Sequence, residues 1–144
     1  MQEQNLKNHS QFVPSYHYVL FTLVLVILVL SIVNLVSAFS VAGSLIPALI
    51  FLFTAVSLAF IFLLFRAFAL KAQDRAIRAE ENLRHFALTG KFLDSSLKVQ
   101  QIVALRFASD DEFVALAARA AKENLSNKDI KAAIKTWRGD YYRV

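Results

Sequence analysis

A long stretch of this chain carries no charged side chain, and that stretch restricts the folds open to it. Between Lys7 and Arg66, residues 8–65 contain no Asp, Glu, Lys or Arg. Two apolar runs of 21 residues each, 18–38 and 45–65, lie inside it. About 20 apolar residues in a helix are enough to cross a hydrocarbon core roughly 30 Å thick. The sequence therefore predicts a transmembrane hairpin of two helices.

The backbone of both runs is expected to be helical. The many Val and Ile residues of the first run would favour a strand in water, but within lipid a helix satisfies every backbone polar group internally. Gly43 lies between the two runs and Pro47 opens the second one, and neither Gly nor Pro interrupts the chain from there to Gly90. We therefore expect the second helix to continue past Arg66 into the cytoplasm over residues 68–88, a length of about 30 Å, and Gly90 to cap it.

Basic residues predict the orientation of this hairpin. The loop between the runs has no charge, whereas six basic residues flank the two runs on their other side: Lys7, Arg66, Lys71, Arg75, Arg78 and Arg84. The positive-inside rule then places both termini in the cytoplasm. A cleaved signal peptide is the alternative, because small residues 40–42 precede Gly43. Against it, the first run is longer than the 7–15 residues of a signal peptide and no positive segment precedes it.

The remaining 79 residues, 66–144, predict a small helical unit. They hold 15 basic and 10 acidic side chains, a difference of +5 that equals the net charge of the chain. Three short helices are expected: one over about 95–107, one after a capping box at 109–112, and one after a second box at 126–129 that ends before Gly139. An incomplete apolar stripe precedes them, formed by Ile77, Leu83, Phe86 and Leu88.

The predicted fold class is thus an all-α membrane protein with four segments. They are a polar N-terminal tail (1–17), the hairpin (18–65), an extension of its second helix (66–90) and a small bundle of basic helices (91–144).

Polar and small side chains mark candidate helix contacts inside the membrane. Ser31, Asn34 and Ser37 recur every three residues along the first run, and Ala55 and Ala59 lie on the second. In lipid, such residues allow close packing and hydrogen bonds between helices. We expect contacts between the two helices of one hairpin, and contact with another subunit is the alternative.

A basic stripe marks a candidate interaction surface on the last predicted helix. Lys128, Lys131, Lys135 and Arg138 recur at i, i+3, i+7 and i+10, and Trp137 lies beside them. This face could be solvated, or it could bind anionic lipid or an acidic protein. A nucleic-acid partner is disfavoured because the chain has no recognisable RNA- or DNA-binding motif.

Residue types that carry catalysis are sparse. The chain has no cysteine, and its histidines, His9, His17 and His85, lack the spacing of metal ligands. The acidic residues 110–112 lie where a first helical turn is expected and complement its dipole. No ionisable group lies within either apolar run to serve a transport path. We expect no metal, no cofactor and no enzymatic activity, and rank a small transporter or membrane enzyme last.

The order of these features resembles a family of small, uncharacterised bacterial inner-membrane proteins with two spans. The similar segments run along nearly the whole chain: Asn8-His9, Pro14, His17, Leu83-Arg84, 88–91, 101–110, 123–126, Ile130-Lys131, 133–135, Trp137 and Arg143-Val144. The resemblance implies the architecture and the bacterial inner membrane, but no activity and no site residue.

The function expected from these observations is structural. The chain would be a non-enzymatic accessory subunit that presents its basic helical module to a partner complex in the membrane, or it would form a homo-oligomer. The alternative is a factor that binds anionic lipid through its last helix.

Overall fold

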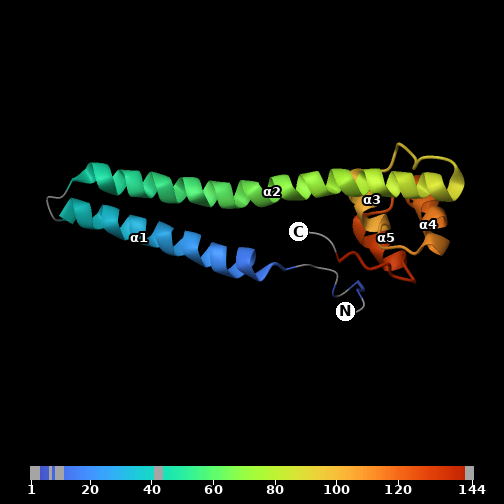
Figure 1. Ribbon diagram of the computed structural model, residues 1–144, viewed down its shortest axis with the longest axis horizontal. Helices are drawn as coiled ribbons and strands as arrows, with labels where there is room; N and C mark the ends of the chain where they lie inside the picture. Colours follow the sequence, from blue (N-terminus) through green and yellow to red (C-terminus); the bar gives the residue numbers. More distant parts are fainter. Residues whose placement is uncertain (1–3, 7, 9–11, 41–43, 142–144) are drawn as a thin grey trace. The chain divides into compact units, whose positions relative to one another are not determined.

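The computed structural model describes residues 4–6, 8, 12–40 and 44–141. The helices of the described residues are η1 (Ser15–Leu20), α1 (Phe21–Ser40), α2 (Leu45–Thr89), α3 (Val99–Leu105), α4 (Asp110–Glu123) and α5 (Asn127–Ala133). Figure 1 labels α1 to α5. Within the described ranges there is no β-strand beyond a single isolated bridge. The predicted all-α fold with two long apolar helices is confirmed. The chain divides into two compact units, residues 12–69 and residues 1–11 with 70–144.

The unit of residues 12–69 is an apolar hairpin. Helices Ser15–Ser40 and Leu45–Thr89 are each long and apolar enough to cross a membrane. In their most apolar 18-residue windows only 6% and 11% of the residues are buried. A core helix of a soluble protein would be mostly buried, so these helices instead expose their apolar side chains.

The open end of the hairpin is fixed by an aromatic contact. The first helix begins at Ser15, three residues earlier than predicted, with a π-helical segment in which the Phe21 N–H donates to the Tyr16 carbonyl oxygen. The Tyr16 ring stacks on Phe62 of α2 with 4.5 Å between centroids, and its hydroxyl donates to the Phe62 carbonyl. The guanidinium of Arg66 lies 5.5 Å from the centroid of the Tyr16 ring.

The two helices of the hairpin pack along a seam with a seven-residue repeat. The least exposed positions of α1 are separated by alternating steps of four and three residues: Val24, Leu28, Ser31, Leu35 and Ala38. The same spacing occurs on α2: Ala48, Leu52, Ala55, Ala59 and Phe62. A 3.5-residue periodicity of contacts is that of left-handed helix pairs. Small side chains at Ser31, Ala48 and Ala55, all at most 5% exposed, let the two backbones approach closely.

The other unit has its own hydrophobic core. The last turns of α2 contribute Ile77 to the buried residues, and α3, α4 and α5 pack around Phe107, Phe113, Leu105 and Ile130. Helix α2 ends as predicted at Gly90, which has a φ of +72° and donates its N–H to the Phe86 carbonyl at 2.7 Å. Only glycine adopts this left-handed conformation at little cost.

The two predicted capping boxes differ in outcome. Ser126 caps α5 as predicted, because its Oγ accepts the N–H of Asp129 at 3.2 Å. The predicted box at Ser109 is wrong, since Ser109 precedes α4 but makes no side-chain capping bond. Its expected partner, Glu112, instead accepts the N–H groups of Lys135 at 3.1 Å and Thr136 at 3.0 Å.

The predicted helix over 95–107 is wrong in extent, because α3 covers only Val99–Leu105. Before it lies a turn in which Asp94 Oδ1 accepts the N–H of Ser96 at 2.8 Å. The backbone N–H of Ser96, followed by its hydroxyl, lowers the pKa of the Asp94 carboxyl below its usual value. A carboxylate that accepts hydrogen bonds in a turn competes with helix formation, so the helix starts later.

The seam predicts the effect of enlarging Ala55, which is 0% exposed. We expect Ala55→Leu to destabilise the hairpin by about 1–3 kcal/mol, because a larger side chain separates the packed helices. The measurement is the loss of helix on titrating the detergent-solubilised chain with SDS. The control is Ala67→Leu, at an exposed position of the same helix. An equal effect of both substitutions would contradict the seam.

Candidate functional site

The basic residues of the predicted stripe do not share one helix face. Helix α5 ends at Ala133, and Ile134 is extended with φ −70° and ψ 125°. Lys128 and Lys131 therefore lie on α5, whereas Lys135 and Arg138 lie beyond it. The predicted continuous helix up to Gly139 is wrong.

Pairing with an earlier segment explains why the chain leaves the helix. Ala108 and Trp137 form an antiparallel bridge, with the Arg138 N–H donating to the Phe107 carbonyl at 2.7 Å. The Ser109 N–H donates to the Thr136 carbonyl at 3.1 Å. Together with the Glu112 carboxylate, these partners engage the N–H groups of Lys135, Thr136 and Arg138 and the carbonyl of Thr136. A further helical turn is therefore not needed to pair these groups.

The basic side chains also differ in their surroundings. The Lys131 Nζ lies 5.7 Å from the centroid of the Phe107 ring, a cation–π contact. The Phe107 ring also packs against Trp137, with 5.1 Å between centroids. Lys128 and Lys135 are exposed to solvent. Trp137 thus belongs to the edge of the core, and Lys128 and Lys135 remain the accessible cations of the predicted stripe.

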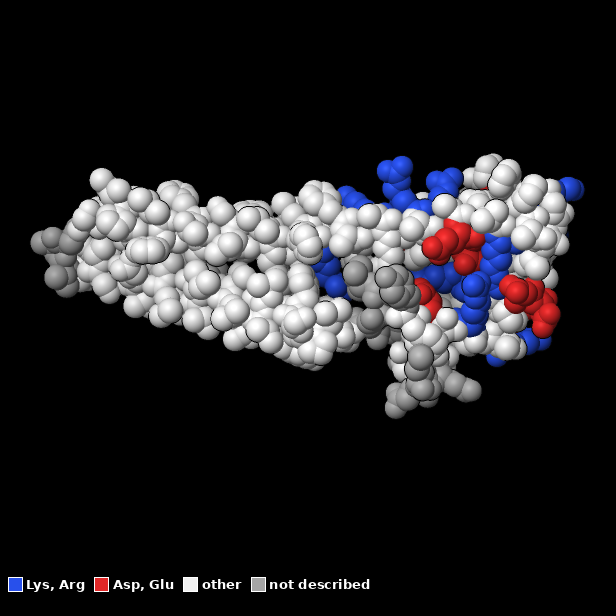
Figure 2. Space-filling model, in the orientation of Figure 1, with Lys and Arg blue, Asp and Glu red and all other residues white. Residues whose placement is uncertain are grey.

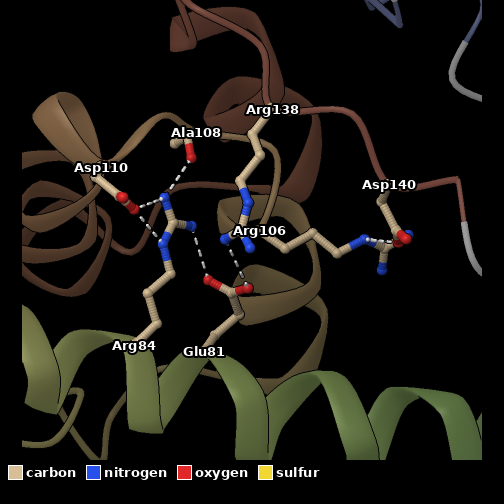
Figure 3. Close-up of polar contacts among 7 residues, drawn as sticks. All are labelled: Glu81, Arg84, Arg106, Ala108, Asp110, Arg138 and Asp140. Carbon is tan, nitrogen blue, oxygen red and sulfur yellow. Dashed lines mark hydrogen bonds and ion pairs between the residues drawn. The ribbon is translucent and has the colours of Figure 1, made fainter.

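A network of carboxylates and guanidinium groups holds α2 to the segments around α4 (Figure 3). Glu81 is 5% exposed and accepts Arg84 Nη1 at 3.0 Å. Arg84 also contacts Asp110 Oδ1 at 2.6 Å and donates to the Ala108 carbonyl at 2.8 Å. The guanidinium carbon of Arg84 lies 4.3 Å from the Phe113 ring centroid. The Arg84 side chain, only 11% exposed, is surrounded by acceptors and an aromatic face.

The same network reaches the C-terminal segment. Arg138 Nη1 lies 3.9 Å from the second oxygen of Glu81, and Arg106 Nε lies 2.9 Å from Asp140 Oδ2. Gln4 bonds reciprocally to the Asp140 backbone, donating to its carbonyl at 3.0 Å and accepting its N–H at 2.9 Å. The three least exposed of these ions are Glu81, Arg84 and Arg106, with side-chain exposures of 7%, 11% and 9%. Each of them lies beside at least one opposite charge, as nearly buried ions require.

An exposed apolar patch lies on the same unit and consists of Leu83, Phe86 and Phe92. Their exposures are 66%, 45% and 68%, and the Phe86 and Phe92 rings stack with 5.1 Å between centroids. The apolar stripe predicted from the sequence is thus divided, because Ile77 is buried in the core whereas Leu83, Phe86 and Leu88 are exposed. Phe92 gave no signal in the sequence, since it lies after α2 in a segment without helical periodicity.

A cavity of about 540 Å³ adjoins this apolar patch. Phe92 forms part of its wall, and its floor is lined by small and aliphatic side chains that include Leu93, Leu97, Val114 and Ala117. His85 and Lys91 also line the cavity. The imidazole of His85 contacts the backbone there, since its Nδ1 lies 2.7 Å from the Lys91 carbonyl oxygen. A cavity with a largely aliphatic lining on one part, beside two exposed aromatic rings, is suited to receive an apolar side chain of a partner.

The candidate helix contacts of the hairpin separate into two groups. Ser31 and Ala55 lie in the seam, with exposures of 5% and 0%, and Ala59 is half-buried there. Asn34 and Ser37 are exposed on α1 instead. In the described part of the chain, no group of three or more His, Asp or Glu side chains is placed to hold a metal ion.

The network predicts a specific loss when Glu81 is removed. We expect Glu81→Ala to destabilise this unit by about 1–3 kcal/mol, because nearly buried Arg84 loses a charged partner. Amide exchange of residues 134–141 should accelerate as well, since Arg138 loses the same carboxylate. Hydrogen exchange of the full-length chain in micelles measures both effects. The control is Glu80→Ala, at the exposed neighbouring position, and unchanged exchange in both variants would contradict the role of Glu81.

Comparison with known proteins places this architecture in a family. No curated protein and no solved structure matches the chain. The model of a family of unknown function, DUF6526, matches residues 1–144. This match covers the whole chain, and the segments that carry the resemblance seen in the sequence run along nearly all of it. The chain belongs to the DUF6526 family of unknown function.

Proposed function

We propose that this protein is a non-enzymatic accessory subunit anchored in the bacterial inner membrane. In this proposal the hairpin of residues 12–69 crosses the bilayer twice and both termini are cytoplasmic. The unit that follows binds a partner protein through the apolar patch of Leu83, Phe86 and Phe92.

Solvation supports the membrane location. The helices of the hairpin expose large apolar side chains along their length, including Leu30 at 61%, Phe53 at 67% and Phe65 at 68%. In water, each such side chain would cost about 1.5–3 kcal/mol relative to burial, whereas lipid removes this cost. Residues 8–65 carry no charged side chain, so the blue and red side chains in Figure 2 lie on other parts of the chain.

Contacts between distant parts of the sequence support termini on one side. Gln4 precedes the first apolar helix and Asp140 follows the second, and their two hydrogen bonds join segments 136 residues apart. A chain that crossed the bilayer once would separate these segments by the hydrocarbon core. Both segments also belong to the same compact unit, in agreement with the positive-inside rule.

The exposed aromatic pair is the observation that carries the partner-binding proposal. Phe86 and Phe92 stay exposed although the unit has a complete core of its own, with Phe107 and Phe113 at most 1% exposed. Aromatic residues are enriched among those that dominate binding energy at protein interfaces. The cavity beside Phe92 offers a partner a pocket with apolar and polar walls. Its lining includes Lys91 and Lys122 against one acidic residue, Asp94, so its charge slightly favours an acidic group on that partner.

Binding to anionic lipid through the last helix has less support. Helix α5 has seven residues, so only Lys128 and Lys131 of the predicted stripe remain helical. Lys131 is partly engaged by the Phe107 ring. Stable attachment to a lipid surface needs a larger amphipathic face with several cations.

Site-directed photo-cross-linking in cells tests the proposal. A benzophenone side chain at Phe92 should yield one discrete protein adduct, because that ring lies in the apolar patch. The same group at Ala115, an exposed position on α4, is the matched control and should yield little. Phe86→Ser should reduce the adduct from position 92. Lipid adducts alone, or equal yields from both positions, would contradict a protein partner at the patch.

A further inference from the structure

A second seven-residue row runs along α1, away from the seam with α2. It consists of Leu23, Ile27, Leu30, Asn34 and Ser37, again separated by steps of four and three residues, and all five are exposed. The three apolar members are 54%, 42% and 61% exposed. This row has the periodicity of a helix–helix interface but, within the described ranges, no helix of this chain covers it.

Asn34 distinguishes this row from the other apolar faces of the hairpin. Among the described residues, no group hydrogen-bonds to its side-chain amide. The nearby hydroxyls are satisfied, because Thr54 donates to the Ile50 carbonyl at 2.8 Å and Ser31 to the Leu28 carbonyl at 2.7 Å. Asn34 therefore has two N–H donors and an acceptor for which the hairpin supplies no partner.

A shallow groove lies at this amide. It has a volume of about 280 Å³ and is lined by Ile27, Leu30, Ser31, Asn34, Phe51 and Thr54. Its walls come from α1 and α2, so it is a hole into which a side chain of another helix can insert. Apart from Asn34 and the two satisfied hydroxyls, its lining is apolar.

The chemistry of an amide selects the occupant of this groove. In lipid, water does not reach the amide, so its polar atoms need partners on another helix. An Asn side chain both donates and accepts, which makes it complementary to a copy of itself across a twofold axis. One Asn in a seven-residue repeat is also the feature that fixes register and two-stranded pairing in parallel coiled coils, and Asn34 is the one amide in this row, whose other polar member is Ser37. Two copies of the chain that insert into one membrane with the same orientation can pair their α1 helices in this parallel arrangement.

We propose that the protein forms a parallel homodimer through α1, in which the two Asn34 side chains hydrogen-bond to each other. Leu30 and Ile27 of each copy pack against those of the other and enter the facing groove. The proposal rests on the proposed membrane-spanning hairpin. It adds a second copy of this chain as a partner inside the membrane, besides the partner bound at the cytoplasmic apolar patch.

Disulfide cross-linking of the full-length chain in its membrane tests this proposal, because the natural sequence has no cysteine. Leu30→Cys lies in the row, and Val29→Cys is its matched control one residue away, 51% exposed on another face. Mild oxidation should give several-fold more dimer from Leu30→Cys. Added to Leu30→Cys, Asn34→Leu should lower the cross-linked fraction by about threefold or more, whereas Asn34→Gln, which can also donate and accept, should retain it.

Each result bears on a distinct part of the proposal. Equal yields from Leu30→Cys and Val29→Cys, or monomer alone in the membrane fraction, would overturn the dimer and leave the hairpin intact. Adducts with a different protein would overturn the second copy as occupant, and a yield unchanged by Asn34→Leu would overturn the role of the amide. Recovery of the chain in the soluble fraction would instead overturn the proposed membrane anchor itself.

Discussion

The solvation of two apolar helices is the constraint on which the rest of this protein depends. From residue 8 to residue 65 no side chain carries a charge, and most of the large apolar side chains of α1 and the first half of α2 are exposed. In lipid these helices gain nothing from hydrophobic contact with each other, so they pair through close packing and polar contacts. Ala48, Ala55 and Ser31 provide the close packing, and Tyr16, stacked on Phe62, closes the open end.

The unit that contains α3, α4 and α5 differs from the hairpin because it buries large apolar side chains in a core of its own. Its core is small. Beside that core, the carboxylate of Glu81 contacts the guanidinium groups of both Arg84 and Arg138. The C-terminal segment does not continue as a helix, because the backbone of Thr136 and Arg138 pairs with that of Ser109 and Phe107. The apolar residues that find no place in this core, Leu83, Phe86 and Phe92, then form the patch assigned to a partner.

The sequence predicted the elements whose signals are local and failed where distant segments compete. The charge-free runs, the unbroken α2 and the cap at Gly90 follow from residues within one element. The end of α5 does not, because the helical pattern of Ile130, Ile134 and Trp137 is overridden by pairing of residues 136–138 with 107–109. The prediction of Glu112 as a capping residue also fails, because its carboxylate accepts the backbone N–H of Lys135, which lies 23 residues away in the sequence. Asn34 was recognised as a polar contact, but its outward position depends on which face of α1 meets α2.

Labelling of single cysteines in intact cells tests the membrane-spanning hairpin most directly. Ser44→Cys lies where the chain turns between the two apolar helices, and Ser96→Cys lies in the turn before α3. If both helices cross the bilayer, a membrane-impermeant maleimide should label Ser44→Cys from outside intact cells, and label Ser96→Cys only after lysis. Equal labelling at the two positions, or labelling of Ser96→Cys in intact cells with Ser44→Cys protected, would contradict the hairpin and its orientation.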